Sequence, residues 1–155
     1  LSAGADKIFL NSVLYKNKKI IEKIAYIYGS QSIVGGLNII NNFDKYYLME
    51  DKLKKIDPIE HIKELELSGV GEIKVIFVNS EGAKKGLDIH YAKKILNNTK
   101  VPVIFEGGIG NLEHLIECIK AGIKSLSIGT IITFNDNNII KIKQYIKNAG
   151  FEVRI

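Results

Sequence analysis

The chain has 155 residues, of which 46% are hydrophobic, so it is long enough to bury one core. Its formal net charge of +5 comes from lysines spread along helix faces, and no basic surface with interleaved aromatic residues is visible, which disfavours nucleic-acid binding. The sequence has neither a secretory signal pattern nor an apolar run of membrane-spanning length, so we expect no membrane association. The single cysteine, Cys118, excludes an internal disulfide and is typical of the reducing cytoplasm.

Short β-rich runs alternate with amphipathic helical stretches along the chain. This alternation predicts an α/β fold with a parallel sheet and crossover helices. Consecutive strands begin roughly 24 to 40 residues apart, which suits one strand–helix unit each, with one insertion. The predicted strands are Lys7–Asn11, Ser32–Asn38, Glu72–Asn79, Val101–Gly107 and Ser125–Gly129.

Helix boundaries are marked by capping residues and glycines. Asp57 and Pro58 combine an N-cap with a proline at the first helical position. Apolar stripes with helical spacing predict three further helices, each of which ends at a glycine. The stripes begin at Ile20, Leu112 and Ile139, and the terminating glycines are Gly29, Gly122 and Gly150.

The insertion between the second and third strands covers residues 39–55 and contains Phe43, Tyr46, Tyr47 and Leu48. This composition predicts a small hairpin over one rim of the fold. A loop of this length is often functional, and a purely structural filler is the alternative.

Two of the predicted strands end in glycines and open onto a helix. Residues 104–111 read IFEGGIGN, and residues 127–130 read SIGT. Glycines let the backbone approach an anion, and the N–H groups of the following helix point toward it. Two adjacent junctions of this kind near the C-terminus are where a TIM barrel builds its phosphate site. They predict that Gly107, Gly108, Gly129 and Thr130 bind a phosphorylated small molecule.

The predicted fold class is therefore the TIM (βα)8-barrel family, present here as an incomplete barrel of about five βα units. We expect residues 1–155 to form a single domain, the C-terminal part of such a barrel. The strand Lys7–Asn11 would lie at an open edge with unpaired backbone groups. Either upstream units belong to the same protein, which we favour, or the edge pairs with another copy of the chain.

The predicted strand ends carry small and polar side chains, without histidine or cysteine among them. This set predicts neither a zinc site nor a Cys–His nucleophile, and we expect no cofactor. His61, His90 and His114 fall in helical stretches, where surface or packing roles are expected, and Cys118 is expected to pack inside a helix.

Several motifs occur in a fixed order along the chain: GAD at 4–6 before Lys7 and Asn11, GSQSIV at 29–34, GVGEI at 69–73, EG at 81–82 with GLD at 86–88, GGIG at 107–110 with EH at 113–114, and VRI at 153–155. This series resembles the cyclase subunit of imidazole glycerol phosphate synthase. The resemblance spans nearly the whole chain, at nearly the family spacing, and corresponds to barrel strands four to eight.

The resemblance implies a lyase subunit of histidine biosynthesis. Such a subunit takes ammonia from a glutaminase partner on the N-terminal face and, at the C-terminal face, uses it to cleave a phosphoribulosyl substrate and close an imidazole ring. Lys7 and Glu72 match the charged ring that gates ammonia, with an ordinary salt bridge as the alternative, and Asp6 and Gln31 match the glutaminase interface. Substrate or phosphate contacts are implied for Asn11, Ser12, Gly82, Gly107, Gly108, Gly129 and Thr130.

Three positions depart from the family pattern. Asn38 and Asn79 stand where the family has aspartates that act as acid or base, and a carboxamide does not exchange protons near neutral pH. Loss of one such group typically lowers the rate by about 10²–10⁴. Glu106 replaces a small residue, and its carboxylate about 5 Å from a phosphate charge would be repelled by about 3 kcal/mol at an effective dielectric near 20. That repulsion disfavours a phosphate unless Glu106 turns away or contacts a cation.

Three hypotheses follow from this pattern. The first is a working cyclase in which Asn38 and Asn79 only hold substrate. The second is an altered paralogue that conducts ammonia to a sugar-modifying amidotransferase in bacterial surface polysaccharide biosynthesis, and the third is a gene remnant without function. The residues leave the choice between the first two open.

Overall fold

The computed structural model describes residues 1–43, 45–51, 56–133 and 137–154. It contains a six-stranded sheet in which five strands run parallel in the order β1-β2-β4-β5-β6. These strands are β1 (Ile8–Leu10), β2 (Ile33–Asn42), β4 (Glu72–Phe77), β5 (Val103–Glu106) and β6 (Leu126–Ser127). The predicted α/β fold of about five parallel units, a partial TIM barrel, is confirmed.

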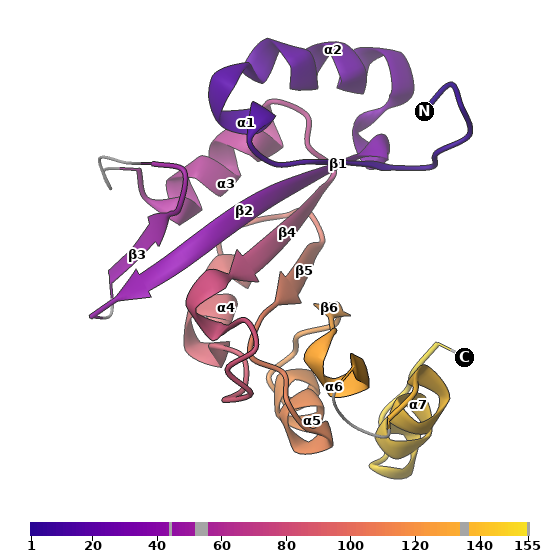
Figure 1. The fold of residues 1–155 in the computed structure, drawn as a ribbon. Helices are drawn as coiled ribbons and strands as arrows, with labels where there is room; N and C mark the ends of the chain where they lie inside the picture. The colour runs from indigo at the N-terminus through magenta and orange to yellow at the C-terminus, as the bar shows by residue number, and fades with distance from the viewer. Residues whose placement is uncertain (44, 52–55, 134–136, 155) are drawn as a thin grey trace.

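Helices follow the strands along the chain, and α2 to α5 lie along one side of the fanned sheet (Figure 1). The predicted start of α3 is confirmed: Asp57 Oδ1 accepts hydrogen bonds from the backbone N–H groups of Ile59 and Glu60. The helices are α1 (Val13–Lys16), α2 (Lys18–Tyr28), α3 (Pro58–Leu67), α4 (Ile89–Leu96), α5 (Leu112–Lys120), α6 (Thr130–Thr133) and α7 (Ile139–Asn148), with 3-10 turns η1 (Ser30–Ser32) and η2 (Val78–Ser80).

The two faces of the sheet differ in burial. In β4, Ile73, Val75 and Phe77 are buried, whereas Glu72, Lys74 and Ile76 are only partly buried. Residues paired in the register of neighbouring strands point to the same face of the sheet. The partners of Glu72, Lys74 and Ile76 on the other strands therefore lie on the same face as these three residues. We name this surface the inner face, and it comprises Phe9, Val34, Gly36, Asn38, Glu72, Lys74, Ile76, Ile104, Glu106 and Ser127.

The predicted hairpin is confirmed, although its first strand is longer than expected. β3 (Lys45–Leu48) pairs antiparallel with the second half of β2, from Asn42 opposite Lys45 to Ile39 opposite Leu48. The strand expected to end at Asn38 therefore runs on to Asn42, because β3 supplies a pairing partner there. Asp44 and residues 52–55 of the insertion lie outside the described residues.

The end of β4 also differs from expectation. The parallel ladder between β2 and β4 ends at the pair Ile39 and Phe77, and the next residues after β4 form η2. Asn79 thus lies in a 3-10 turn rather than in a strand. Within the described part of the chain, β1 and β6 each pair with one strand only and form the two edges of the sheet.

Candidate functional site at the carboxyl ends of β5 and β6

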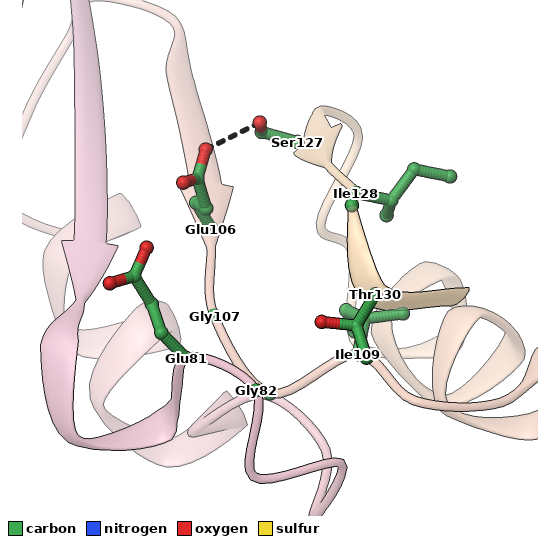
Figure 2. Close-up of a pocket in the computed structure, with 10 residues that line it drawn as sticks. Glu81, Gly82, Glu106, Gly107, Ile109, Ser127, Ile128 and Thr130 are labelled. Carbon is green, nitrogen blue, oxygen red and sulfur yellow. Dashed lines mark hydrogen bonds between the residues drawn. The ribbon is translucent and has the colours of Figure 1, made fainter. Parts of the chain in front are cut away.

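A pocket of about 180 Å³ lies where β5 and β6 end. This is the edge of a parallel α/β sheet at which ligands usually bind, because the loops after the strands converge there. Figure 2 shows glycine backbone at the floor, Thr130 on one side and two carboxylates, Glu81 and Glu106, on the other. The pocket is lined by Glu81, Gly82, Glu106, Gly107, Gly108, Ile109, Ser127, Ile128, Gly129 and Thr130.

The floor of the pocket requires glycine at two positions. Gly107 and Gly108 have φ values of 116° and 85°, in the left-handed region that favours glycine. A Cβ on Gly108 would overlap the carbonyl oxygen of Gly86, and one on Gly107 would lie 2.8 Å from the carbonyl oxygen of Phe77. The Gly86 N–H donates to the Gly108 carbonyl at 2.9 Å, so the loop that follows η2 is fixed against the glycine pair.

Glu106 is held by two neighbouring strands. Lys74 Nζ of β4 lies 2.6 Å from Glu106 Oε2, and Ser127 Oγ of β6 donates to the same oxygen at 2.5 Å. Burial raises the pKa of Glu106, but the hydrogen bonds from Lys74 and Ser127 and the charge of Lys74 outweigh it, so that the pKa lies below its ordinary value. Glu106 therefore contacts a cation, which is one of the two conditions set above for a phosphate, and a second carboxylate, Glu81, lines the same pocket.

The predicted phosphate-binding residues separate into two groups. Five of them, Gly82, Gly107, Gly108, Gly129 and Thr130, line this pocket together. Asn11 and Ser12 do not, because they follow β1 at the far edge of the sheet. Asn11 Oδ1 is buried and has no hydrogen-bond partner among the described residues.

The two asparagines predicted to occupy acid–base positions, Asn38 and Asn79, lie outside the pocket and form hydrogen bonds of their own. Asn38 Nδ2 donates to Glu50 Oε1 at 2.6 Å, next to the hairpin. Asn79 Oδ1 accepts from the backbone N–H of Asn41 at 2.8 Å and so ties η2 to the end of β2. Both side chains therefore brace the hairpin, and neither contact tests a catalytic role.

At the opposite end of the strands, Lys7 Nζ and Glu72 Oε2 form an ion pair of 2.7 Å. It spans β2, because β1 and β4 lie on either side of that strand. Asp6 and Gln31 are exposed near this end of the sheet, and Gln31 Nε2 donates to the Tyr28 carbonyl at 3.1 Å. The ion pair agrees with both interpretations of Lys7 and Glu72, a gate and an ordinary salt bridge.

The other titratable groups that the structure describes were compared with the requirements of a metal site and of a reactive thiol. Among the described residues, no group of three or more His, Cys, Asp or Glu side chains could hold a metal ion. Cys118 is buried in α5, where burial, followed by the charge of Glu117, raises the thiol pKa to about 11. Such a thiol is protonated at neutral pH and unreactive.

Sequence reasoning missed three side chains at or beside this site: Lys74, Glu81 and Ser127. Glu81 was visible as a carboxylate next to Gly82. The signal for Lys74 was its spacing, because it lies two residues from Glu72 and must share that residue's face of the strand. Its pairing with Glu106 depended on the register between β4 and β5, which the sequence does not specify.

The chain forms part of a parallel barrel, and its glycine-floored pocket lies at the carboxyl ends of the strands. These two features define a class of α/β proteins that bind small molecules at that edge. Within that class, the chain matches the family described as "Histidine biosynthesis protein" over residues 1–138, and it belongs to that family.

The curated relatives are named imidazole glycerol phosphate synthase subunit HisF. The protein from Sulfurisphaera tokodaii is 33% identical over 160 residues, which cover 100% of this chain and 63% of the relative. The protein from Clostridium botulinum strain 657 is 32% identical over 100% of the chain and 64% of the relative, and that from Pyrobaculum aerophilum is 30% identical over 99% and 62%. The chain thus spans a little under two thirds of the length of these relatives. No helix in the described part of the chain has the length and apolarity needed to cross a membrane.

Proposed function

We propose that residues 1–155 form the C-terminal part of a (βα)8-barrel subunit that acts in histidine biosynthesis as a cyclase of the imidazole glycerol phosphate synthase type. The subunit would receive ammonia from a glutaminase partner in the cytoplasm and close the imidazole ring of a phosphoribulosyl substrate. One observation carries the proposal: five residues predicted to bind phosphate, from three separate loops, line a single pocket at the expected edge of the sheet.

In this proposal the pocket receives one phosphate of the substrate. The backbone of Gly107 and Gly108 can approach it without obstruction by a side chain, and the Thr130 hydroxyl faces the same space (Figure 2). Asn11 and Ser12, at the far edge, would hold another part of an extended substrate. The Lys7–Glu72 pair would lie at the end of the barrel where ammonia enters.

The second candidate function is the conduction of ammonia to a different acceptor enzyme, without cyclase chemistry in this subunit. The amides of Asn38 and Asn79 favour it, since neither can transfer a proton and both are engaged in bracing the hairpin. Asp6, Lys7, Gln31 and Glu72, which match the ammonia-entry side, would keep their roles in that case.

An ammonia-driven assay separates the two candidates. The native protein that contains this chain is supplied with an ammonium salt and the phosphoribulosyl substrate, so that no glutaminase is needed. Turnover at a rate ordinary for a cyclase supports the first function. A folded protein without turnover that still binds and activates a glutaminase supports the second.

A further inference from the structure

Asn38 lies on the inner face of the sheet, at the point where the hairpin returns to β2. Its register partner on β4 is Ile76, so the two side chains share the inner face. β3 runs antiparallel along the second half of β2 (Figure 1), and the Met49 N–H donates to the Asn38 carbonyl at 2.8 Å. The residue after Met49 is Glu50, which the hairpin thus brings beside Asn38.

The Asn38 side-chain amide has a fixed orientation. Its Nδ2 donates to Glu50 Oε1 at 2.6 Å, in partly buried surroundings. A carboxylate accepts hydrogen bonds and donates none, so it binds the amide only through the NH2 group. The reversed amide would place two acceptors, Oδ1 and Oε1, against each other. Asn38 therefore keeps Oδ1 on the side away from Glu50, where the oxygen is accessible and no described residue donates to it.

Glu50 is supported by α1 and, through α1, by α3. The Tyr15 hydroxyl of α1 bonds to Glu50 with loose geometry, since neither Tyr15 Oη nor Glu50 Oε2 has a well-formed partner. Burial, followed by the charge of Glu50 and this bond, raises the pKa of Tyr15. The Tyr15 ring stacks on that of His61 in α3, with centroids 4.8 Å apart. A ring stack, a hydroxyl and a carboxylate thus connect α3 to Asn38.

The charge of Glu50 also acts on the acceptor strength of the Asn38 amide. Among the described residues, the Glu50 carboxylate has no ion-pair partner. A hydrogen bond from an amide N–H to an anion draws electron density toward the carbonyl oxygen, because groups bonded in a chain polarise one another. Asn38 Oδ1 is thereby a stronger acceptor than the oxygen of an isolated amide, although it cannot take up a proton near neutral pH.

We propose that Glu50 is a positioning residue, which holds Asn38 Oδ1 toward the inner face as the hydrogen-bond acceptor for an N–H or O–H group of the substrate. The proposal rests on the proposed function, because it takes Asn38 to touch the substrate of a cyclase-type subunit. It assigns Asn38 no proton transfer. It also gives a residue of the insertion a role in the interior of the barrel.

The first measurement is kcat/KM of the native protein in the ammonia-driven assay with the phosphoribulosyl substrate. Glu50→Gln replaces an acceptor by a side chain that also donates, so the Asn38 amide can reverse. We expect kcat/KM to fall by about tenfold, the effect of one hydrogen bond. Asn38→Asp/Glu50→Gln exchanges the two groups: the new amide donates to the new carboxylate, whose second oxygen is again an acceptor on the inner face. This double variant should recover most of the loss.

Glu66→Gln is the matched control for the removal of a carboxylate charge. Glu66 Oε2 also accepts a side-chain and a backbone hydrogen bond, from Thr99 and Lys100, but before the start of β5. This variant should leave kcat/KM unchanged, and thermal unfolding checks that each variant is folded. A Glu50→Gln variant that is less stable but has an unchanged kcat/KM would show a purely structural role and overturn the proposal.

A titration separates this inference from the proposed function, because it needs no turnover. In Asn38→Asp two carboxylates face each other and share a proton, so one apparent pKa should exceed about 6 by carboxyl 13C NMR of labelled aspartate and glutamate. Addition of Glu50→Gln should return the value to about 4. The other titratable groups beside Glu50, Tyr15 and His61, carry no such label.

A raised pKa without turnover by the wild type would support the placement of Glu50 against Asn38 and count against the proposed function alone. Turnover with an aspartate that titrates near about 4 in both variants would overturn this inference alone. Neither turnover nor a raised pKa would overturn both. If Asn38→Asp does not fold, the Asn38 side-chain N–H resonances decide, since they should shift in Glu50→Gln but not in Glu66→Gln.

Discussion

His61 is a buried histidine in α3, and neither of its ring nitrogens has a hydrogen-bond partner among the described residues. It is 2% exposed, and its ring stacks on that of Tyr15 with centroids 4.8 Å apart. Nδ1 lies 3.5 Å from Glu64 Oε2, which is too far for a good hydrogen bond. Burial lowers the pKa of His61; the Glu64 carboxylate opposes it, with smaller effects from Lys18 and Glu50. The folded protein therefore keeps this ring neutral.

This neutral ring predicts a loss of stability in mild acid. The pKa of His61 is lower in the folded than in the unfolded state, where it is about 6.5, so the unfolded chain binds more protons below that pH. The free energy of unfolding should then fall with decreasing pH, by at most about 1.4 kcal/mol per pH unit, until the folded pKa is reached. Urea denaturation of the native protein between about pH 7.5 and about pH 5 measures this slope.

His61→Phe keeps the ring stack and removes the titration, so its slope over the same range should be smaller. The carboxyl groups whose pKa is lowered, Glu64 and Glu106, lose their contribution only below their unfolded pKa of about 4.5, outside this range. Identical slopes for the two proteins would show that His61 is not the group responsible.

Gly108 and Gly129 line the same pocket but differ in the space available for a Cβ atom. Gly108→Ala would force a Cβ against the Gly86 carbonyl at a φ of 85°, and should lower the free energy of unfolding by about 2 kcal/mol or more. Gly129→Ala is the control, because no atom lies within 4 Å of its Cβ, and its stability should change by less than about 0.5 kcal/mol. Denaturant titration of both variants tests the pair, and equal losses would contradict the geometry.

At the scale of elements, the hairpin is joined to α4 by one tyrosine. Tyr46 Oη donates to Asp88 Oδ2 at 2.6 Å, and the Tyr46 ring stacks on Tyr91 with centroids 3.4 Å apart. Asp88 is also the N-cap of α4, since its Oδ1 accepts from the Tyr91 N–H. The insertion thus packs on the helix that follows β4 and is part of the fold.

Tyr46→Phe should destabilise the protein by about 1–2 kcal/mol, because it keeps the ring stack but removes a hydrogen bond to a carboxylate. Tyr26→Phe is the control, as Tyr26 is 92% exposed on α2 and its hydroxyl contributes little. Thermal unfolding of both variants measures the difference. A Tyr46→Phe variant as stable as Tyr26→Phe would mean that the hairpin is not fixed to α4 in this way.

The order of the elements could be predicted because each strand and helix carries its own periodicity. The Asp57-Pro58 start of α3 and the glycine stop at Gly29 are local signals, and both are confirmed. The extension of β2 beyond Asn38 could not be predicted, because it depends on pairing with β3. Of the candidate site, the glycine floor was predictable from local composition, whereas the ion pair between Lys74 and Glu106 depends on the alignment of two strands.

At the scale of the whole molecule, the sheet has two edges in the described part of the chain, β1 and β6. Near the second edge, an apolar groove of about 580 Å³ lies between α5 and α7 and is lined by residues such as Leu115, Ile119, Ile142 and Ile146. Unpaired strand edges beside apolar surface promote association with another chain.

We therefore expect the 155-residue chain, produced by itself, to associate in a concentration-dependent manner. Sedimentation velocity over a range of concentrations, combined with thermal unfolding, measures this. A monomer at every concentration, with one cooperative unfolding transition, would contradict the expectation and would show that these edges are protected in solution.

Two ion pairs on the inner face connect β4 to the strands on its two sides. Glu72 pairs with Lys7, which precedes β1, and Lys74 pairs with Glu106 of β5. If β4 slipped by two residues against its neighbours, every apolar side chain would stay on its own face, because side chains alternate with a period of two. Burial of apolar side chains alone would therefore not distinguish such a misfolded sheet from the native one. A slip in one direction would nevertheless separate Glu72 from Lys7, and a slip in the other would separate Lys74 from Glu106, so that either leaves a partly buried carboxylate farther from its cation, at a cost in free energy. The charges of β4 thus discriminate the native strand alignment from its most plausible competitor.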